Sequence, residues 1–291
     1  MSTPDQQKVT DEVTGTVTTQ HEWDGIQELD TPLPRWWLWT FYITIVWGVA
    51  YTIAYPAWPL INSATEGVLG YSSRAEVADS MAQANADRAD ISAQIAETPF
   101  VEIATNQELD DFARAGGAAV FRTYCSQCHG AGAAGVVGGY PNLLDDDWLW
   151  GGDHDAIAGT IRHGIRWEED DDTRWSEMPA FGRDEILSKQ EIEDVAEHVL
   201  SWSGAAEPNE AGSEIYADNC ASCHGDDGGG DRDQGAPNLA DAIWLYGADK
   251  TAVVYSITNA RFGVMPAWNT RLTESEIRQV THYVHGLGGG E

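Results

Sequence analysis

The longest apolar run of the chain lies near its N-terminus. From Trp36 to Tyr55 the sequence WWLWTFYITIVWGVAYTIAY holds twenty residues without a charge. A helix of this length, at about 1.5 Å per residue, extends roughly 30 Å and matches the hydrocarbon core of a bilayer. Tryptophan and tyrosine gather at both ends of the run, as aromatic rings do at membrane interfaces. The pattern predicts a single transmembrane anchor helix over residues 35–57.

The charges around this run indicate its direction. Arg35 stands at its N-terminal end, whereas the other end carries no charge until Glu66. Because cytoplasmic flanks of membrane spans are enriched in Lys and Arg, we expect residues 1–34 to form a cytoplasmic tail and the rest of the chain to lie across the membrane. The acidic N-terminal region and the missing small-residue cleavage site argue against a cleaved signal peptide.

The segment that follows has a different composition. Residues 58–107 are rich in Ala, Asp and Ser and lack a continuous apolar face. This pattern predicts a partly helical linker.

Helical periodicity appears in two later segments, LSKQEIEDVAEHV and LTESEIRQVTHYV. Each places three branched apolar residues on one helix face, namely Ile192, Val195 and Val199 in the first and Ile277, Val280 and Val284 in the second. Each also opens with a capping box, formed by Ser188 with Glu191 and by Thr273 with Glu276. Two amphipathic helices are therefore predicted.

These helices close the two copies of an internal repeat. Gly117, Phe121 and Cys125 match Gly212, Tyr216 and Cys220 at an offset of 95 residues, and the tripeptides Pro-Asn-Leu and Met-Pro-Ala also recur. Neither copy shows the alternation typical of strands, and the two glycines mark points of close helix approach. We predict an all-α fold, in which the transmembrane helix is followed by two tandem domains over residues 108–205 and 206–291.

The charge of the chain is strongly negative. It carries 47 acidic and 16 basic residues, a net charge of −31. Nucleic-acid binding is excluded, because contacts to phosphates need clustered Lys and Arg. Two interpretations remain: a surface that steers a basic partner protein, or a surface adapted to high salt. The even spread of the acidic residues favours the second.

The chain has four cysteines, and all lie in two Cys-x-x-Cys-His motifs, YCSQCHG and NCASCHG. This motif is typical of covalent c-type haem attachment. A redox-active cysteine pair does not need the adjacent His, a zinc site would bring its cysteine pairs closer together, and so short a loop is a poor place for a structural disulfide. We predict two covalently bound c-type haems, held through Cys125 and Cys128 and through Cys220 and Cys223.

Axial iron ligands follow from the same repeats. His129 and His224 are adjacent to the second cysteines, and Met178 and Met265 recur at equivalent positions before Pro-Ala. We predict that His129 and Met178 ligate the first iron, and His224 and Met265 the second. In the first copy His154 and His163 are alternatives to Met178. The other histidines, His21, His198, His282 and His285, are interpreted as polar surface or helix residues.

His/Met ligation raises the haem potential and fills all six iron positions, so such a centre passes electrons. Haem attachment takes place outside the bacterial inner membrane, which agrees with a periplasmic location of both domains.

Each repeat resembles a class I cytochrome c domain in its glycine-and-aromatic helix, its haem motif, its Pro-Asn-Leu turn, its Met-Pro pair and its closing helix. The resemblance implies that the carbonyl groups of Pro141 and Pro237 accept a hydrogen bond from the proximal histidine of their repeat. The segment Trp23–Leu60 is similar to the opening of the di-haem subunit, subunit III, of cbb3-type cytochrome c oxidases. Together these resemblances cover nearly the whole chain.

The family implies an electron relay that is not an enzyme by itself. A cytochrome c donor delivers electrons, which pass to the mono-haem c subunit and then to the haem–copper catalytic subunit that reduces oxygen and pumps protons. One alternative is a free-standing, membrane-tethered di-haem carrier that serves another dehydrogenase or reductase. A haem enzyme or gas sensor is a third interpretation, and it requires an open iron position.

Overall fold

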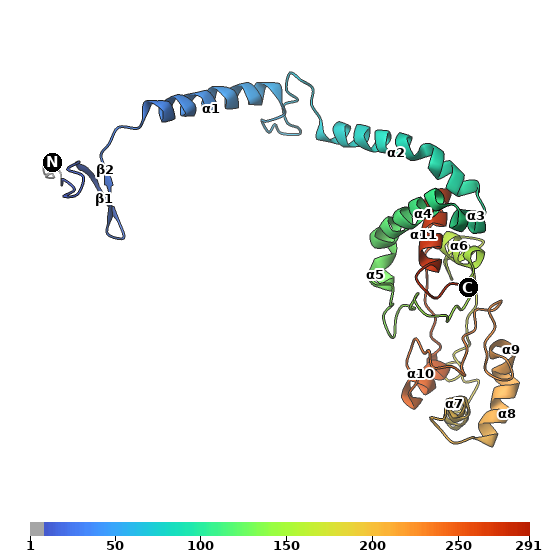
Figure 1. Ribbon diagram of the computed structural model, residues 1–291. Helices are drawn as coiled ribbons and strands as arrows, with labels where there is room; N and C mark the ends of the chain where they lie inside the picture. The colour runs from blue at the N-terminus through green and yellow to red at the C-terminus, as the bar shows by residue number, and fades with distance from the viewer. Residues whose placement is uncertain (1–8) are drawn as a thin grey trace. The chain divides into compact units, whose positions relative to one another are not determined.

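The computed structural model describes residues 9–291 and is mostly helical, as the sequence predicts (Figure 1). It divides into two compact units, one that ends at Ala86 and one that runs from Asp87 to Glu291. The predicted cytoplasmic tail falls partly outside the described residues, at positions 1–8.

The first unit begins with a β-hairpin. Strands β1 (Thr18–Trp23) and β2 (Ile26–Leu29) are antiparallel. Asp24 and Gly25 join them with φ angles of 50° and 82°, as a tight hairpin turn requires. This hairpin is not among the elements predicted from the sequence. Its strands have only six and four residues, too few for a clear alternation of apolar and polar side chains.

Helix α1 (Arg35–Ala54) coincides with the predicted membrane span, although it ends at Ala54 rather than at residue 57. Its mean hydropathy is 1.4 and none of its residues is buried in the protein. Among residues 9–291 it is the one helix that is long and apolar enough to cross a membrane. An apolar helix without a protein partner has lipid as its natural environment, so the predicted anchor is confirmed.

The second unit contains the two repeats. In chain order its helices are the end of α2 (Ser73–Glu97), α3 (Phe100–Thr105), α4 (Gln107–Val120), the π-helix η1 (Phe121–Cys125), α5 (Ser126–His129), α6 (His154–His163), α7 (Lys189–Trp202), α8 (Glu210–Asn219), α9 (Ala221–His224), α10 (Lys250–Asn259) and α11 (Glu274–His285). Both predicted capping boxes are present, at the starts of α7 and α11. The all-α prediction is confirmed for this unit.

The long helices pair across the repeats rather than within them. Helix α11, which closes the second repeat, packs against α4 of the first, and α7, which closes the first repeat, packs against α8 of the second (Figure 1). A Cβ atom at Gly117 would lie 2.2 Å from the carbonyl oxygen of Gln279, and one at Gly212 would lie 2.1 Å from that of Asp194. Both glycines are points of close approach, as predicted, but each receives the helix of the other repeat.

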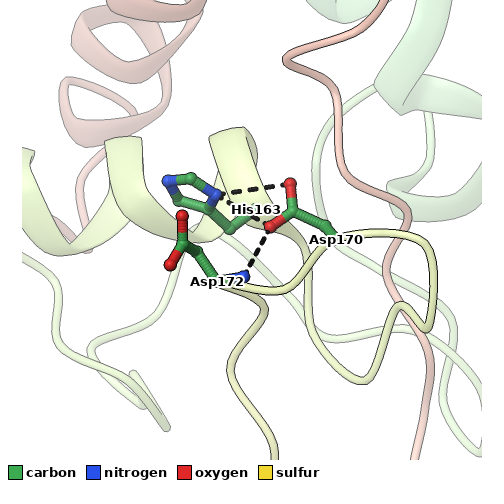
Figure 2. Close-up of side chains that lie close together, drawn as sticks. All are labelled: His163, Asp170 and Asp172. Carbon is green, nitrogen blue, oxygen red and sulfur yellow. Dashed lines mark hydrogen bonds and ion pairs between the residues drawn. The ribbon is translucent and has the colours of Figure 1, made fainter.

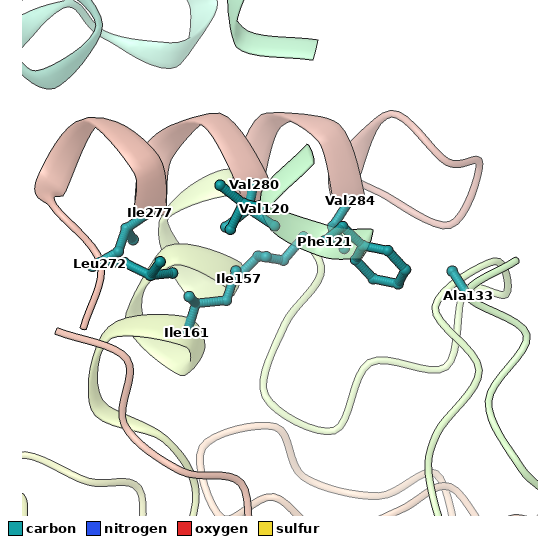
Figure 3. Packing of buried hydrophobic residues seen from close by; sticks show 9 residues of the cluster. All are labelled: Val120, Phe121, Ala133, Ile157, Ile161, Leu272, Ile277, Val280 and Val284. Atoms are coloured by element: carbon teal, nitrogen blue, oxygen red, sulfur yellow. The ribbon is translucent and has the colours of Figure 1, made fainter. Parts of the chain in front are cut away.

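Two hydrophobic cores result from this crossing. The first core combines Val120, Phe121, Ala133, Ile157 and Ile161 of the first repeat with Leu272, Ile277, Val280 and Val284 of the second (Figure 3). The second core combines Phe181, Ile192, Val195, Ala196, Val199 and Leu200 of the first repeat with Tyr216, Val253 and Ile257 of the second. Each core therefore crosses the predicted boundary between residues 205 and 206, which separates the sequence repeats and not the packed units.

A third cluster extends the first core towards the N-terminus. Ile95, Phe100 and Ile103 are buried together with Leu109 and Ala158. These first three residues belong to the range 58–107 that was predicted to be a linker. The C-terminal end of that range therefore packs against the first repeat.

Candidate haem-binding sites

Each Cys-x-x-Cys-His motif forms a short helical turn directly after a longer helix. In the first repeat α4 continues through η1 into α5, and in the second α9 follows α8. Gly130 and Gly225 end these turns, each with a φ of 79° in the region that favours glycine. The helical turn places both cysteines and the histidine, at positions i, i+3 and i+4, on one side of the chain.

Both proximal histidines are oriented by a proline carbonyl. The Nδ1 atom of His129 lies 3.1 Å from the carbonyl oxygen of Pro141, and that of His224 lies 3.0 Å from the oxygen of Pro237. A carbonyl oxygen only accepts, so Nδ1 carries the proton and Nε2 keeps its lone pair for a metal. Burial lowers the pKa of both histidines, which favours the neutral imidazole that an iron ligand requires.

The four thiols are free, and none of them forms a disulfide. Burial raises the pKa of Cys125 and of Cys220 to about 11. Both thiols are therefore protonated at neutral pH. Free thiols in a helical turn agree with thioether attachment.

The two methionines lie at the cores of the opposite repeats. Met265 packs against the first core, as Cys125 does, and its backbone pairs with Ile165 through N–O distances of 2.9 and 3.0 Å. Met178 packs against the second core, as Cys220 does. The sequence analysis expected the methionine and histidine of one repeat to lie together, whereas each methionine packs against the core that holds the haem motif of the other repeat. The reason is the crossing, because the chain beyond each methionine leads into the closing helix that packs on the other repeat.

The two alternative ligands of the first copy have other contacts. The ring of His154 stacks on those of Phe100 and His285, with centroid distances of 4.6 and 3.6 Å. Nδ1 of His163 lies 3.0 Å from a carboxylate oxygen of Asp170. These histidines are engaged in packing and pairing within the protein.

Figure 2 shows the group around His163, which also includes Asp170 and Asp172. Their potential ligand atoms lie within 4.8 Å of one another, close enough for one divalent cation. Asp170 also accepts hydrogen bonds from the backbone N–H of Asp172 and from Asn269, at 2.9 and 2.6 Å. The group therefore ties the loop after α6 to the segment that follows Met265.

His282 is more buried than the sequence indicated. It was interpreted as a polar surface or helix residue; it lies on helix α11, but its exposed fraction is 3% and its Nε2 lies 2.6 Å from a carboxylate oxygen of Asp110. Ser275 and Gln279 share its burial and its face of α11. The spacing 275, 279, 282 is a second helical stripe, beside the apolar one, and would have indicated a buried polar face against α4.

Trp150 provides a test of whether these residues fit a haem. Its indole N–H is buried and, among the described residues, has no hydrogen-bond acceptor. The Arg174 guanidinium lies 5.5 Å from its ring and donates to its carbonyl oxygen. A buried N–H donor needs an acceptor, and the carboxylate groups of a haem are acceptors that suit a donor beside an arginine. Together with the oriented histidines and free thiols, the residues fit covalent haem.

Comparison with known families matches three segments of the chain. Residues 15–62 match the N-terminal domain of cytochrome oxidase-cbb3, FixP. Residues 113–199 and 207–284 each match the family of cytochrome c oxidase, cbb3-type, subunit III. The two matched segments of this second family coincide with the two sequence repeats.

Curated relatives give the same result. The chain is 59% identical over 280 residues to the cbb3-type cytochrome c oxidase subunit CcoP of Cereibacter sphaeroides, with 94% of this chain and 95% of the relative covered. It is 51% identical to the cbb3-type cytochrome c oxidase subunit FixP of Sinorhizobium medicae, over 99% of both chains. A CcoP subunit of Rhodobacter capsulatus is 50% identical, over 94% of this chain and 96% of the relative.

Proposed function

The chain belongs to the family of cbb3-type cytochrome c oxidase subunit III, and on that premise we propose that it carries two covalent haems, one at each Cys-x-x-Cys-His motif. It is a membrane-anchored cytochrome c that transfers electrons to the oxidase. The observation that carries the proposal is the pair of equivalent sites. Each has two free thiols and a histidine whose Nδ1 is held by a proline carbonyl.

The axial ligands are crossed between the repeats in this proposal. His129 and Met265 would hold the first iron, and His224 and Met178 would hold the second. The packing of Met265 on the first core and of Met178 on the second supports this pairing. It replaces the pairing within each repeat that the sequence suggested.

When bound, each haem supplies an iron that changes between the ferrous and ferric states, at a potential raised by His/Met ligation. The protein's own groups keep that change reversible. The carbonyls of Pro141 and Pro237 hold the imidazole rings in one orientation. The two methionines would hold the irons on the side opposite the histidines, which would leave no open position for oxygen and no catalytic site in this subunit.

We place the N-terminus in the cytoplasm and both haem units in the periplasm, on the charges that flank α1. Electrons arrive from a cytochrome c and leave to the mono-haem c subunit and the haem–copper catalytic subunit.

The haem content and the pairing are tested together in one set of variants. A pyridine haemochrome assay of the purified chain should give two c-type haems per polypeptide. In a variant with Cys220→Ala and Cys223→Ala only the first haem remains, and there Met265→Ala should abolish the absorption band of methionine-ligated ferric haem. Met178→Ala is the matched control and should leave that band intact. The reverse pattern would contradict the crossed pairing, and a colourless protein would contradict the whole proposal.

A further inference from the structure

The Arg166 side chain connects the two segments that carry the methionines. Its Nε donates to the carbonyl oxygen of Gly263, and its Nη1 donates to that of Ser176, both at 2.7 Å. Gly263 stands two residues before Met265, and Ser176 stands two residues before Met178. One guanidinium group therefore holds both methionine segments at equivalent positions.

The surroundings of Arg166 show that this arrangement is not an ordinary surface contact. The residue is partly buried, and burial lowers the pKa of its guanidinium. The chain offers 47 acidic residues, yet these two hydrogen bonds go to backbone carbonyl groups. The guanidinium also lies 5.6 Å from the ring of Phe262, the neighbour of Gly263, at a distance suited to a cation–π contact.

The backbone of Arg166 is constrained as well. Its φ angle is 52°, in the left-handed region that residues other than glycine rarely adopt. Its N–H donates to the carbonyl oxygen of Arg174 at 2.8 Å, and the preceding residue, Ile165, pairs with the backbone of Met265. Such a conformation persists only where its surroundings determine it, and it is found most often at functional sites.

We propose that Arg166 is a shared positioning residue, which keeps Met178 and Met265 seated at their two irons at once. This inference rests on the proposed function, since it requires both methionines to be axial ligands. The planar fork of the guanidinium can reach two acceptors in fixed directions, whereas a lysine ammonium acts as a single point. Loss of the side chain frees both segments, so the two centres lose their methionine together.

Arg278 offers a matched control. It also donates to two backbone carbonyls, those of Ile95 and Thr98, and lies 4.1 Å from the ring of Phe100. Burial lowers the pKa of its guanidinium too. The segments that it joins carry no proposed ligand. If Arg166 had only a structural role, substitution of Arg166 and substitution of Arg278 should therefore have equal effects on methionine ligation.

The experiment measures methionine ligation and not electron transfer. Arg166→Ala, Arg166→Lys, Arg166→Gln and Arg278→Ala are purified as full chains in detergent, and haem content is determined for each. The absorption band of methionine-ligated ferric haem is then titrated with imidazole, which competes with methionine for the iron. Backgrounds with Met178→His or Met265→His report one centre at a time.

In Arg166→Ala we expect both centres to bind imidazole roughly tenfold more tightly, because a hydrogen bond from a charged donor is worth about one decade in an equilibrium constant. Arg166→Gln should behave similarly, and Arg166→Lys should restore at most one centre. Arg278→Ala should lower the melting temperature and leave both imidazole affinities unchanged.

Two results would overturn the inference: unchanged affinity at either centre in Arg166→Ala and Arg166→Gln, or an equal increase in Arg278→Ala. If the unmutated protein holds two haems but shows no methionine band, the proposed ligand set is itself wrong. If instead the methionine band is normal and persists unchanged in the Arg166 variants, only the positioning role of Arg166 is wrong.

Discussion

At the position where the first repeat has Phe121, the second has Tyr216, whose hydroxyl donates to the carbonyl oxygen of Gly225 at 2.7 Å. Where the first has His154, stacked between aromatic rings, the second has Lys250, which is exposed and lies 2.7 Å from a carboxylate oxygen of Glu197. In the first repeat Leu109 and Ala158 also belong to the third hydrophobic cluster, to which α3 and the end of α2 contribute.

The comparison shows that one repeated pattern is stabilised in two ways. The first repeat adds packing and a group of histidines around the shared helices. The second repeat relies on a buried hydroxyl and on surface ion pairs, which typically contribute little in water. We therefore expect mutations to distinguish the two repeats by their response to pH and to a lost hydroxyl, whereas the glycine crossings should affect both.

The largest effect is expected at the crossings. In Gly117→Ala and Gly212→Ala the new methyl group would collide with the backbone of the partner helix, which cannot rotate away as a side chain can. We expect each substitution to lower the free energy of unfolding by about 3 kcal/mol or more. Urea denaturation, followed by helical circular dichroism, measures the loss.

Gly132→Ala is the control, because its added Cβ would meet nothing within 4 Å. Equal stabilities of Gly117→Ala and Gly132→Ala would show that α11 does not press on α4 as closely as the structure indicates.

A smaller effect, confined to the first repeat, is expected from His154. Burial, and then the neighbouring His285 and His282, lower its pKa from 6.5 to about 4. The unfolded chain therefore takes up a proton between these values while the folded chain does not, so stability decreases as the pH falls from 6.5 to about 4. Allowing for solvent screening at a half-buried group, we expect a loss of roughly 1 to 2 kcal/mol.

The variant His154→Asn should flatten this part of the pH profile, as measured by urea denaturation at a series of pH values. Lys250→Ala changes the equivalent residue of the second repeat and should leave the slope as it is. A slope that survives in His154→Asn would assign the acid sensitivity to another group.

The smallest effect is expected from the buried hydroxyl of Tyr216 in the second repeat. Tyr216→Phe removes the donor to Gly225 and keeps the ring in the core. We expect a loss of about 1 kcal/mol in the free energy of unfolding, measured by thermal or urea denaturation. Tyr255→Phe, at a tyrosine that is 52% exposed, should change stability much less. Equal losses of stability in Tyr216→Phe and Tyr255→Phe would contradict the proposed difference between the two repeats.

The sequence predicted the helices and their capping residues better than it predicted which helices pack against each other. The apolar run, the capping boxes and the two glycines are local signals, and each is found in the structure where it was expected. Which repeat receives which closing helix depends on packing between equivalent surfaces. Because the two repeats have nearly the same apolar pattern, either pairing satisfies the periodicity of Ile192 or Ile277.

The same reasoning explains the residues that were missed. Arg166 is recognisable only when the segments before Met178 and Met265 are known to lie at one place. The polar stripe of Ser275, Gln279 and His282 indicates a buried face of α11. It does not identify Asp110 as the partner of His282, because Asp110 lies on a helix distant in the sequence and no periodic pattern marks that contact.

The exchange of closing helices has a consequence for how the polypeptide is made. Synthesis proceeds from the N-terminus, so the first cysteine motif leaves the ribosome long before Glu274–His285, the helix that packs against α4. Until that helix has been made, the apolar residues of the first core lack the side chains that complete it. A truncation near the C-terminus would therefore expose the core of the first repeat rather than that of the second.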